Sequence, residues 1–301
     1  HKLRFVSSSL SLIHLPICLI VSSSLEGPLL STIFVSSFFF TLKMQEILSN
    51  NTLRKTILIT GATSGIGKAL SKIYLKNDWI VIGIGRDKTK IEEFFINFPD
   101  NFYFYQTDLN NFEKTNIIFD EIFSKFKNIN SFILNAGIYI PEDFQNFKFI
   151  NAQETFNVNV LSIYLILDKM KSFFELTHTH TIAIISSVAG YRGLPKSTLY
   201  GPTKSALINL AEALKIDLPK VNIKLINPGF VETPATSVNQ FKMPFLISAE
   251  KAAKIIFSKI YQKGFEISFP FPFNILMKFG RILPYRLYFK IAKRISNNNE
   301  K

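Results

Sequence analysis

The stretch Thr56-Ile-Leu-Ile-Thr-Gly-Ala-Thr-Ser-Gly-Ile-Gly67 leads into the amphipathic segment 68–75 and decides the fold. Its first five residues are typical of a buried parallel strand. Gly61, Gly65 and Gly67 permit positive φ and close backbone approach, and a helix N-terminus offers free N–H groups and the positive end of its dipole. A glycine-rich turn alone also fits an ordinary loop, but the strand, turn and helix in this order predict a pyrophosphate cradle.

A second motif, Tyr200-Gly-Pro-Thr-Lys204, lies thirteen residues after Ser187. Residues i and i+4 of a helix share one face, so Tyr200 and Lys204 are expected one turn apart. An isolated tyrosine titrates near about pH 10, and a neighbouring ammonium favours its phenolate. The spacing alone also fits a solvated amphipathic pair. In the company of the glycine-rich turn, it makes Tyr200 the candidate general acid/base.

Apolar and amphipathic segments alternate along the rest of the chain. Strands are expected near residues 56–60, 79–84, 102–106, 131–134, 181–186, 221–226 and 265–268, with helices between them. This alternation predicts an α/β fold, a Rossmann-type, doubly wound parallel sheet of seven strands with helices on both faces. Ligands of such sheets bind beyond the carboxyl ends of the strands, so the motifs are expected to meet at one edge.

Together these motifs resemble the short-chain dehydrogenase/reductase family, in its single-domain branch of about 250 residues. The resemblance runs from about Thr56 to Thr233. It rests on the T-G-x-x-x-G-I-G turn, Asp108-Leu109, Asn135-Ala-Gly137, Asn159, Ile185-Ser-Ser187, Tyr200 with Lys204, Asn227-Pro-Gly229 and Thr233. A sugar epimerase is disfavoured because the turn spacing and the length differ from that branch.

The resemblance implies hydride transfer between a nicotinamide and the carbonyl or alcohol carbon of a small molecule. Tyr200 would pass the proton, and Lys204 would hold the nicotinamide ribose and lower the pKa of Tyr200. Ser187 would hydrogen-bond the substrate oxygen, Asn159 would organise a water relay behind Lys204, and Ser186 is expected to be structural. The alternative is a non-catalytic, NADP-binding regulatory or interaction protein of this fold, but the complete catalytic set argues against it.

The end of the second expected strand bears on cofactor choice. Gly85 stands where an NAD-preferring enzyme usually places an acid for the ribose 2′-hydroxyl, and Arg86 follows it. Because an arginine accepts a 2′-phosphate, NADP(H) is expected as the preferred cofactor and NAD(H) as the alternative. The competing interpretation is that Arg86 pairs only with Asp87 or solvent.

The resemblance also implies individual cofactor contacts. Asp108 would bind the adenine amino group with Leu109 on the ring, and the Val231 backbone and Thr233 hydroxyl would bind the carboxamide. Asn135-Ala-Gly137 would let the backbone approach the adenine ribose while bracing the central strand. The expected cofactor-binding residues are Gly61, Thr63, Ser64, Gly65, Ile66, Gly67, Arg86, Asp108, Leu109, Asn135, Ala136, Gly137, Tyr200, Lys204, Pro228, Gly229, Val231 and Thr233.

The 301 residues are expected to divide into three parts. Between Arg4 and Glu26 lie 21 uncharged residues, seven of them Ser, with Pro16 in the middle. The length of this stretch fits a membrane span, and its basic start followed by apolar residues fits a signal peptide. We expect instead that residues 1–43 are an upstream extension and that Met44 is the start of the working protein. Residues 44–270 are expected to form the catalytic domain and 271–301 a basic tail.

The composition of the chain argues against several other kinds of protein and site. A single cysteine, Cys18, excludes an internal disulfide framework, and four scattered histidines predict no metal site. His178 and His180 are expected to be solvated loop residues. The net charge is +13, but outside the tail the basic residues are dispersed and no recognition motif appears, so no nucleic-acid partner is expected. The resemblance implies a homodimer or homotetramer, and the protein is expected in the cytoplasm.

The expected substrate pocket is apolar, which favours a lipophilic ketone or alcohol. Its candidate lining comes from the segments after the fifth strand and after Thr233. An equally weighted alternative is that these side chains pack the lid itself. They are Val188, Tyr191, Met243, Pro244, Phe245 and Leu246.

The tail after Pro284 predicts an amphipathic basic helix. Arg286, Lys290, Lys293 and Arg294 share one helical face, and Leu287, Tyr288, Ile291 and Ile295 share another. Such a helix fits the anionic inner face of a membrane, where it would draw lipophilic substrate from the bilayer. The alternative is a helix that covers the pocket or a subunit interface with a solvated basic side.

Overall fold

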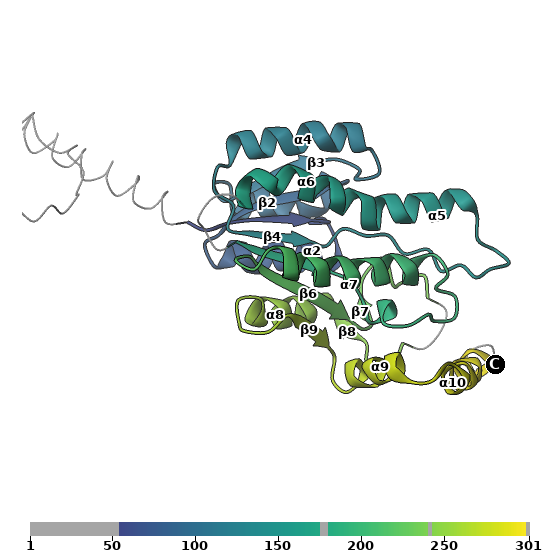
Figure 1. Cartoon of the computed structure of the whole chain (residues 1–301). Coiled ribbons are helices and arrows are strands. Elements are labelled where there is room, and N and C mark those ends of the chain that lie inside the picture. The colour runs from purple at the N-terminus through teal and green to yellow at the C-terminus, as the bar shows by residue number, and fades with distance from the viewer. Residues whose placement is uncertain (1–53, 175–179, 240–242, 299–301) are drawn as a thin grey trace, which may run out of the picture. The chain divides into compact units, whose positions relative to one another are not determined.

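Seven parallel strands form the central sheet in the order β3-β2-β1-β4-β5-β6-β9 (Figure 1). They are β1 (Thr56–Thr60), β2 (Ile80–Gly85), β3 (Phe102–Gln106), β4 (Ser131–Leu134), β5 (Thr181–Ile185), β6 (Asn222–Pro228) and β9 (Glu266–Phe269). The short strands β7 (Val231–Glu232) and β8 (Ile247–Ser248) form a separate parallel pair. The predicted Rossmann-type sheet is confirmed, and each strand end lies within two residues of its predicted place.

This computed structural model describes residues 54–174, 180–239 and 243–298. The predictions about residues 1–43, Met44, Cys18 and His178 therefore fall outside the described residues. Arg54–Lys301 forms one compact unit, which contains the matched motifs and the tail.

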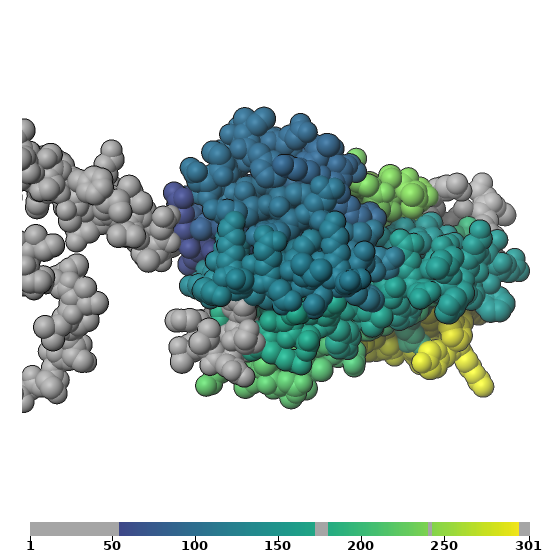
Figure 2. Space-filling view, turned by 90° about the horizontal axis from the view of Figure 1, so that it is seen from above, coloured from purple at the N-terminus to yellow at the C-terminus, as the bar shows by residue number. Residues whose placement is uncertain are grey.

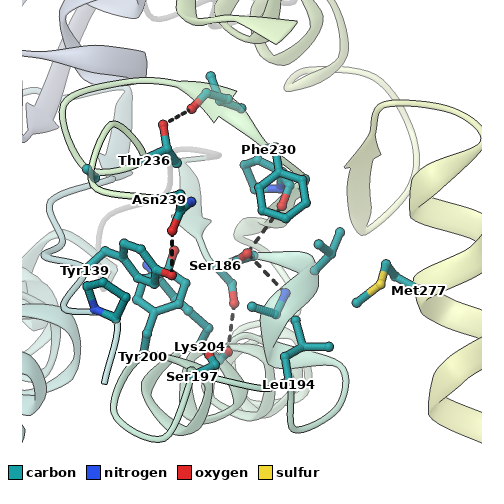
Figure 3. Close-up of a pocket in the computed structure, with 18 of the residues that line it drawn as sticks. Tyr139, Ser186, Leu194, Ser197, Tyr200, Lys204, Phe230, Thr236, Asn239 and Met277 are labelled. Atoms are coloured by element: carbon teal, nitrogen blue, oxygen red, sulfur yellow. Dashed lines mark hydrogen bonds between the residues drawn. The ribbon is translucent and has the colours of Figure 1, made fainter. Parts of the chain in front are cut away.

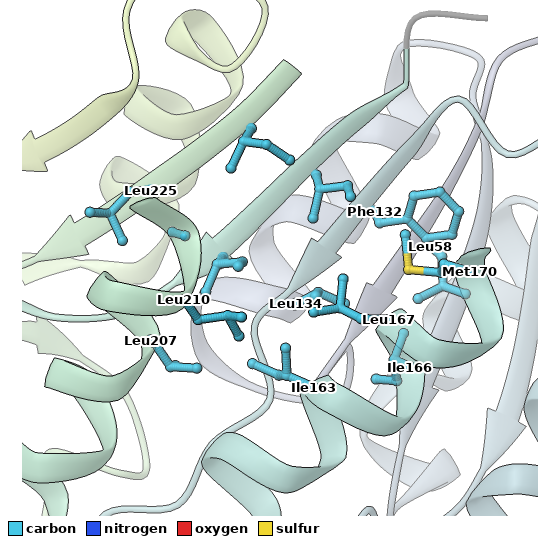
Figure 4. Packing of buried hydrophobic residues seen from close by; sticks show 14 of the residues in the cluster. Leu58, Phe132, Leu134, Ile163, Ile166, Leu167, Met170, Leu207, Leu210 and Leu225 are labelled. Carbon is cyan, nitrogen blue, oxygen red and sulfur yellow. The ribbon is translucent and has the colours of Figure 1, made fainter. Parts of the chain in front are cut away.

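Helices cover both faces of the sheet because side chains of a strand alternate between them. In β1, Leu58 packs into the hydrophobic cluster on one face of the sheet, whereas Ile57 and Ile59 pack into the cluster on the other face. Figure 4 shows the first cluster, where Leu167 and Met170 of a covering helix meet Leu58 and Phe132 of the sheet. The longer helices are α2 (Gly65–Lys76), α3 (Glu92–Asn97), α4 (Phe112–Lys125), α5 (Phe149–Phe156), α6 (Ser162–Phe174), α7 (Tyr200–Asp217), α8 (Ala249–Lys259), α9 (Phe273–Ile282) and α10 (Tyr285–Asn298).

Single-turn elements fill the connections. They are η1 (Lys88–Ile91), the π-helical turn η2 (Asn157–Leu161) and η3 (Val188–Gly190). The strand order reverses between β1 and β4, and a reversal of this kind opens a crevice at the carboxyl ends of the strands. In Figure 1 the strands point toward the side of the molecule that carries α5, α9 and α10. The fold therefore brings the loops after β1, β4, β5 and β6 to one edge.

The prediction for His180 was wrong. Its side chain is 3% exposed, and Nδ1 lies 2.9 Å from the carbonyl oxygen of Ile129. The reason is its place directly before β5, where the backbone already belongs to the sheet: the Asn222 N–H donates to the His180 carbonyl oxygen at 2.8 Å. A residue at this position enters the interior with the strand that follows it.

The predicted helix after Pro284 is present as α10, and a second tail helix, α9, precedes it. Leu283, directly before Pro284, has extended backbone, as expected of a residue that precedes proline, and this ends α9. Pro284 then stands immediately before α10, where its missing N–H costs nothing. In Figure 2 the yellow C-terminal segment emerges at the same end of the molecule as the teal segment that contains α5. The two helices therefore lie near the edge where the motifs meet.

Candidate active site

A cavity of about 1600 Å³ lies at the carboxyl ends of the strands. It brings together most of the predicted site residues, although they come from loops far apart in the sequence. Those that line it are Gly61, Ser64, Gly65, Ile66, Asn135, Ala136, Gly137, Ser187, Tyr200, Lys204, Pro228, Gly229, Val231 and Thr233. Thr63, Gly67, Arg86, Asp108, Leu109 and Asn159 do not line it.

The glycine-rich turn is packed so tightly that side chains would not fit. Gly61 and Gly65 have φ of +68° and +51°, and a Cβ on Gly67 would lie 2.2 Å from the Gly61 carbonyl oxygen. Ser64, at the N-cap of α2, makes no side-chain cap hydrogen bond. The first turn of α2 therefore presents its backbone donors to the cavity, an arrangement that suits an anion.

Asn135 braces the two central strands against each other. Its backbone N–H donates to Thr60 Oγ1 at 2.9 Å, and its Nδ2 donates to the Thr60 carbonyl oxygen at 2.9 Å. The Ala136 N–H also donates to Thr60 Oγ1, at 3.0 Å. A Cβ on Gly61 would meet Asn135 Nδ2 at 2.8 Å, so the turn and the loop after β4 are in direct contact. The predicted bracing role of this motif follows from these bonds.

Tyr200 begins α7, and Lys204 follows one turn later on the same face. The Lys204 Nζ lies 5.4 Å from the centroid of the Tyr200 ring and donates to the Ile185 carbonyl oxygen at 3.0 Å. Ser187 Oγ accepts the Ala189 N–H at 3.1 Å and faces the same cavity. The nucleotide cradle and the predicted acid/base therefore share one cavity.

Burial shapes the acid–base properties of this pair. Burial raises the pKa of Tyr200, and a hydrogen bond with the Ser187 side chain opposes that rise. Burial lowers the pKa of Lys204 from 10.5 to about 8. The predicted lowering of the Tyr200 pKa by Lys204 is not found in the chain alone, because the ammonium donates to Ile185 and is itself destabilised by burial. Tyr200 is thus held in its protonated form.

Asn159 lies behind the cavity wall. It is fully buried in the π-helical turn η2, and its Oδ1 accepts the Ile138 N–H at 2.8 Å. Its Nδ2 donates to the Ile138 carbonyl oxygen at 3.0 Å and to Thr203 Oγ1 at 3.1 Å. A Cβ on Gly137 would lie 3.2 Å from Asn159 Oδ1 and 3.5 Å from Lys204 Nζ. Asn159 therefore fixes the loop after β4 beside Lys204.

Ser186 has the structural place expected of it. It is buried, and its Oγ donates to the Lys204 carbonyl oxygen at 2.7 Å. This bond ties the end of β5 to α7. Figure 3 shows Ser186 among the residues that line the cavity, close to Lys204.

The adenine-side residues lie away from the cavity wall. Arg86 is exposed after β2, and its carbonyl oxygen accepts Gln106 Nε2 at 2.9 Å. Asp87 pairs with Lys90 at 3.5 Å. Asp108 is exposed and accepts the Asn110 N–H at 2.9 Å, whereas Leu109 is buried in the core. Their predicted cofactor contacts stay predictions.

The substrate end of the cavity differs from the sequence prediction. Val188, Pro244 and Phe245 line it, but Met243 and Leu246 do not. Tyr191 was assigned to the pocket wrongly: it is buried and its hydroxyl donates to Glu266. Much of the apolar wall comes instead from the tail, through Phe273, Leu276, Met277, Phe279, Leu283, Leu287 and Ile291. The tail therefore covers the pocket, as one of the two interpretations expects, and contact of the tail with a membrane stays a prediction.

Sequence reasoning also missed Tyr139. Its ring packs edge-on against Tyr200, with centroids 4.9 Å apart and planes at 81°, and its hydroxyl donates to Asn239 Oδ1 at 3.0 Å. In Figure 3 Tyr139 and Tyr200 lie together on one side of the cavity, with Met277 on the other. Tyr139 lies in a loop, where the sequence has no helical or strand periodicity, so no pattern in the sequence indicates its position.

Within the described ranges 54–174, 180–239 and 243–298, no group of His, Cys, Asp and Glu could hold a metal ion. No helix in the same part of the chain is both long enough and apolar enough to cross a membrane.

Comparisons with known proteins identify the family of the chain. A family model described as short chain dehydrogenase matches residues 55–242. The chain is 28% identical over 256 residues to "11-beta-hydroxysteroid dehydrogenase-like 3" of Arabidopsis thaliana, over 77% of this chain and 81% of the relative. It is 30% identical over 189 residues to "Dehydrogenase/reductase SDR family member 11" of Homo sapiens, over 58% of this chain and 73% of the relative. The solved structure "ElxO with NADP Bound" is 28% identical with a TM-score of 0.61, over 72% of this chain and 97% of that one.

Proposed function

Because the chain belongs to the short-chain dehydrogenase family of NAD(P)-dependent oxidoreductases, we propose that it transfers hydride between NADP(H) and a lipophilic carbonyl or alcohol. One observation carries the proposal: Tyr200 and Ser187 face the same cavity as the glycine-rich turn, with Lys204 one turn behind Tyr200. A phenol, a hydroxyl and an ammonium in this arrangement can polarise a carbonyl and move a proton to its oxygen.

The residues present fit a dinucleotide. Gly61, Gly65 and Gly67 hold the turn in a tight shape that excludes side chains, because a Cβ on any of them would lie under 3.0 Å from another protein atom. The uncapped first turn of α2 supplies donors and the positive end of a dipole. The cofactor, when bound, supplies or accepts the hydride. Lys204 would hold its ribose hydroxyls, and Thr233, whose methyl lies 2.9 Å from the place of a Gly65 Cβ, would border its carboxamide end.

The chain's own groups then move the proton. Tyr200 is the general acid for carbonyl reduction, since burial raises its pKa and keeps the phenol protonated at neutral pH. Ser187 hydrogen-bonds the substrate oxygen on the same side of the cavity. Asn159 holds the loop after β4 against Lys204 and so keeps the ammonium in place. In the oxidation direction the phenolate form of the same tyrosine receives the proton from the substrate alcohol.

Lipophilic substrates are favoured by the walls beyond Tyr200. Val188, Phe245 and the apolar side chains of α9 and α10 line that end. Phe230 and Phe273 stack with centroids 5.5 Å apart and add an aromatic surface. An apolar cavity with a few convergent polar groups suits an apolar molecule with one reactive oxygen.

The experiment that tests the cofactor proposal is titration of the full chain with NADPH and with NADH, followed by nicotinamide fluorescence. We expect tight NADPH binding and weaker NADH binding. Arg86→Ala should weaken NADPH about tenfold, as expected for one charge-assisted contact, and leave NADH within about twofold. Arg54→Ala is the matched control, because Arg54 pairs with Asp78 at the opposite end of the sheet.

Binding of neither nucleotide would overturn the enzyme proposal and favour the non-catalytic alternative. Equal loss of both nucleotides in Arg86→Ala would instead remove the NADP(H) preference while leaving the oxidoreductase proposal standing.

Peripheral contact of α9 and α10 with the anionic, cytoplasmic face of a membrane is a further part of the proposal. Between Ile267 and Asn298 the sequence has no Asp or Glu. The two helices also expose apolar side chains beside their basic ones, a combination that suits an anionic bilayer. The exposed apolar residues are Ile275, Leu276, Phe279, Ile282, Tyr285, Leu287, Phe289 and Ile291.

Charge reversal of Lys290, Lys293 and Arg294 to Glu should weaken co-sedimentation with vesicles that contain phosphatidylserine by tenfold or more, on the basis of about 1 kcal/mol per basic residue. The control variant reverses the exposed residues Lys215, Lys251 and Lys254 to Glu. It has the same net charge as the tail variant, but its changes lie on α7 and α8. Equal binding to neutral vesicles, or equal loss in both triple variants, would reject the contact. The predicted homodimer or homotetramer stays a prediction.

A further inference from the structure

Arg192, directly after η3 and Tyr191, binds the end of α9. Its Nη1 lies 3.1, 2.9 and 2.8 Å from the carbonyl oxygens of Gly280, Arg281 and Leu283. The last carbonyl groups of a helix have no partner within it, and they carry the negative end of the helix dipole. A single guanidinium therefore satisfies the C-terminus of α9 with a favourable charge.

The same guanidinium also holds the start of α10. Its central carbon lies 4.5 Å from the ring centroids of both Tyr285 and Tyr288, so two aromatic faces flank it. Tyr288 is 8% exposed, and its hydroxyl donates to the Gly193 carbonyl oxygen. Arg192 and Gly193 thus bind the connection between α9 and α10.

α9 has a second attachment besides Arg192. Lys278 Nζ lies 2.6 Å from Glu266 Oε2, and Glu266 in turn accepts hydrogen bonds from Tyr191 and from Asn227 Nδ2. On α10, by contrast, Tyr288 is the one buried side chain among the described side chains 285–294. Among the described side chains of α10, Tyr285 and Tyr288 therefore attach the helix to Arg192 and Gly193.

The seating of α10 matters because α9 and α10 wall the substrate end of the cavity. Leu276 and Phe279 of α9 and Leu287 and Ile291 of α10 line it while each is more than two-fifths exposed, so they stand at its mouth. We propose that Arg192 is a positioning residue that latches α9 and α10 over the cavity and so controls the fit of apolar substrates. The latch itself stands on the geometry, whereas its effect on substrates rests on the proposed function.

Arg192→Ala tests the latch in the full chain, by hydrogen exchange over residues 273–298 and by kinetics with two probe ketones, 2-decanone and 2-butanone. We expect the amides of α10 to exchange at least tenfold faster, with NADPH affinity within about twofold of wild type. For 2-decanone the KM should rise about tenfold with little change in kcat, while 2-butanone, too short to reach α10, should be affected less than about twofold.

Two variants control this test. Arg192→Lys keeps the charge but loses the planar guanidinium that packs against the rings of Tyr285 and Tyr288, so it should restore protection and KM only in part. Arg281→Ala removes an equal charge from α9, where its contact with Glu212 at 3.9 Å is long, and should leave exchange in α10 unchanged.

The outcomes separate the latch from the proposed function. Unchanged exchange in Arg192→Ala would overturn the latch whatever the kinetics. Faster exchange in a protein that reduces neither ketone would support the latch and count against the proposed substrate class. A raised KM for an anionic keto acid without faster exchange would instead assign Arg192 to substrate binding and overturn its role as a latch.

Discussion

Tyr200→Phe is expected to lower kcat for carbonyl reduction by about 10³-fold or more while NADPH affinity stays within about twofold, in the range that general acid catalysis contributes. The phenol is the proton donor that faces the cavity beside Ser187, and phenylalanine has no proton to give. The ring itself should keep its place, because it packs edge-on against Tyr139 with centroids 4.9 Å apart. Steady-state kinetics with NADPH and fluorescence titration of the cofactor measure the two quantities.

Tyr139→Phe is the matched control, since it removes a second phenol from the same cavity. That hydroxyl donates to Asn239 Oδ1 at 3.0 Å and has no part in the proposed proton transfer. We expect less than about a tenfold loss in kcat. Retained turnover in Tyr200→Phe would refute the assignment of the acid, and loss of NADPH binding would show that the tyrosine supports the cradle instead.

The sheet and its catalytic edge were predictable because they follow from local patterns. Segments such as Thr56–Thr60 and Thr181–Ile185 are runs of apolar, mostly β-branched residues, and every residue in both is buried. Parallel strands end at one edge of a sheet, so motifs placed after each strand must converge there. This is why the sequence alone could predict that Asn135, Ser187 and Tyr200 lie at one site.

The rest of the site depends on contacts that leave no periodic trace in the sequence. Arg192 binds carbonyl oxygens at the end of α9 that are 88 to 91 residues away in the sequence, and Tyr139 binds Asn239, which is 100 residues away. In the sequence, an arginine or a tyrosine in a loop carries no sign of whether its side chain is solvated or bound to a distant partner. Tyr191 was misplaced for the same reason, because its partner Glu266 lies on the distant strand β9.

Function and stability should oppose each other at Lys204. Lys204→Met is expected to lower kcat by about 10²-fold or more, since the ammonium next to Tyr200 is lost, and yet to make the cofactor-free chain more stable at pH 7. The Lys204 side chain is 3% exposed, and burial lowers its pKa from 10.5 to about 8. Below pH 8 the folded chain therefore carries a buried charge that destabilises it by roughly 3 kcal/mol, from about 1.4 kcal/mol per pKa unit.

The sign of the pH dependence follows from proton counts. Between pH 8 and 10.5 the unfolded chain holds the Lys204 proton more often than the folded chain does, so this residue makes the free energy of unfolding rise with pH in that interval. Methionine removes the charge and also the hydrogen bond to the Ile185 carbonyl oxygen, a loss of about 1 kcal/mol. The variant should thus be about 2 kcal/mol more stable than wild type at pH 7, with the gap closing as the pH approaches 10.

Urea unfolding of both proteins at several pH values between 7 and 10 measures this gap. Lys215→Met, an exposed position on the same helix α7, is the control and should change stability by less than about 0.5 kcal/mol at every pH. A Lys204→Met protein that is less stable than wild type at pH 7 would mean that the ammonium stabilises the fold, through its bond to Ile185 or through the helix it anchors. A gap that does not change with pH would mean that the charge of Lys204 plays no part in it.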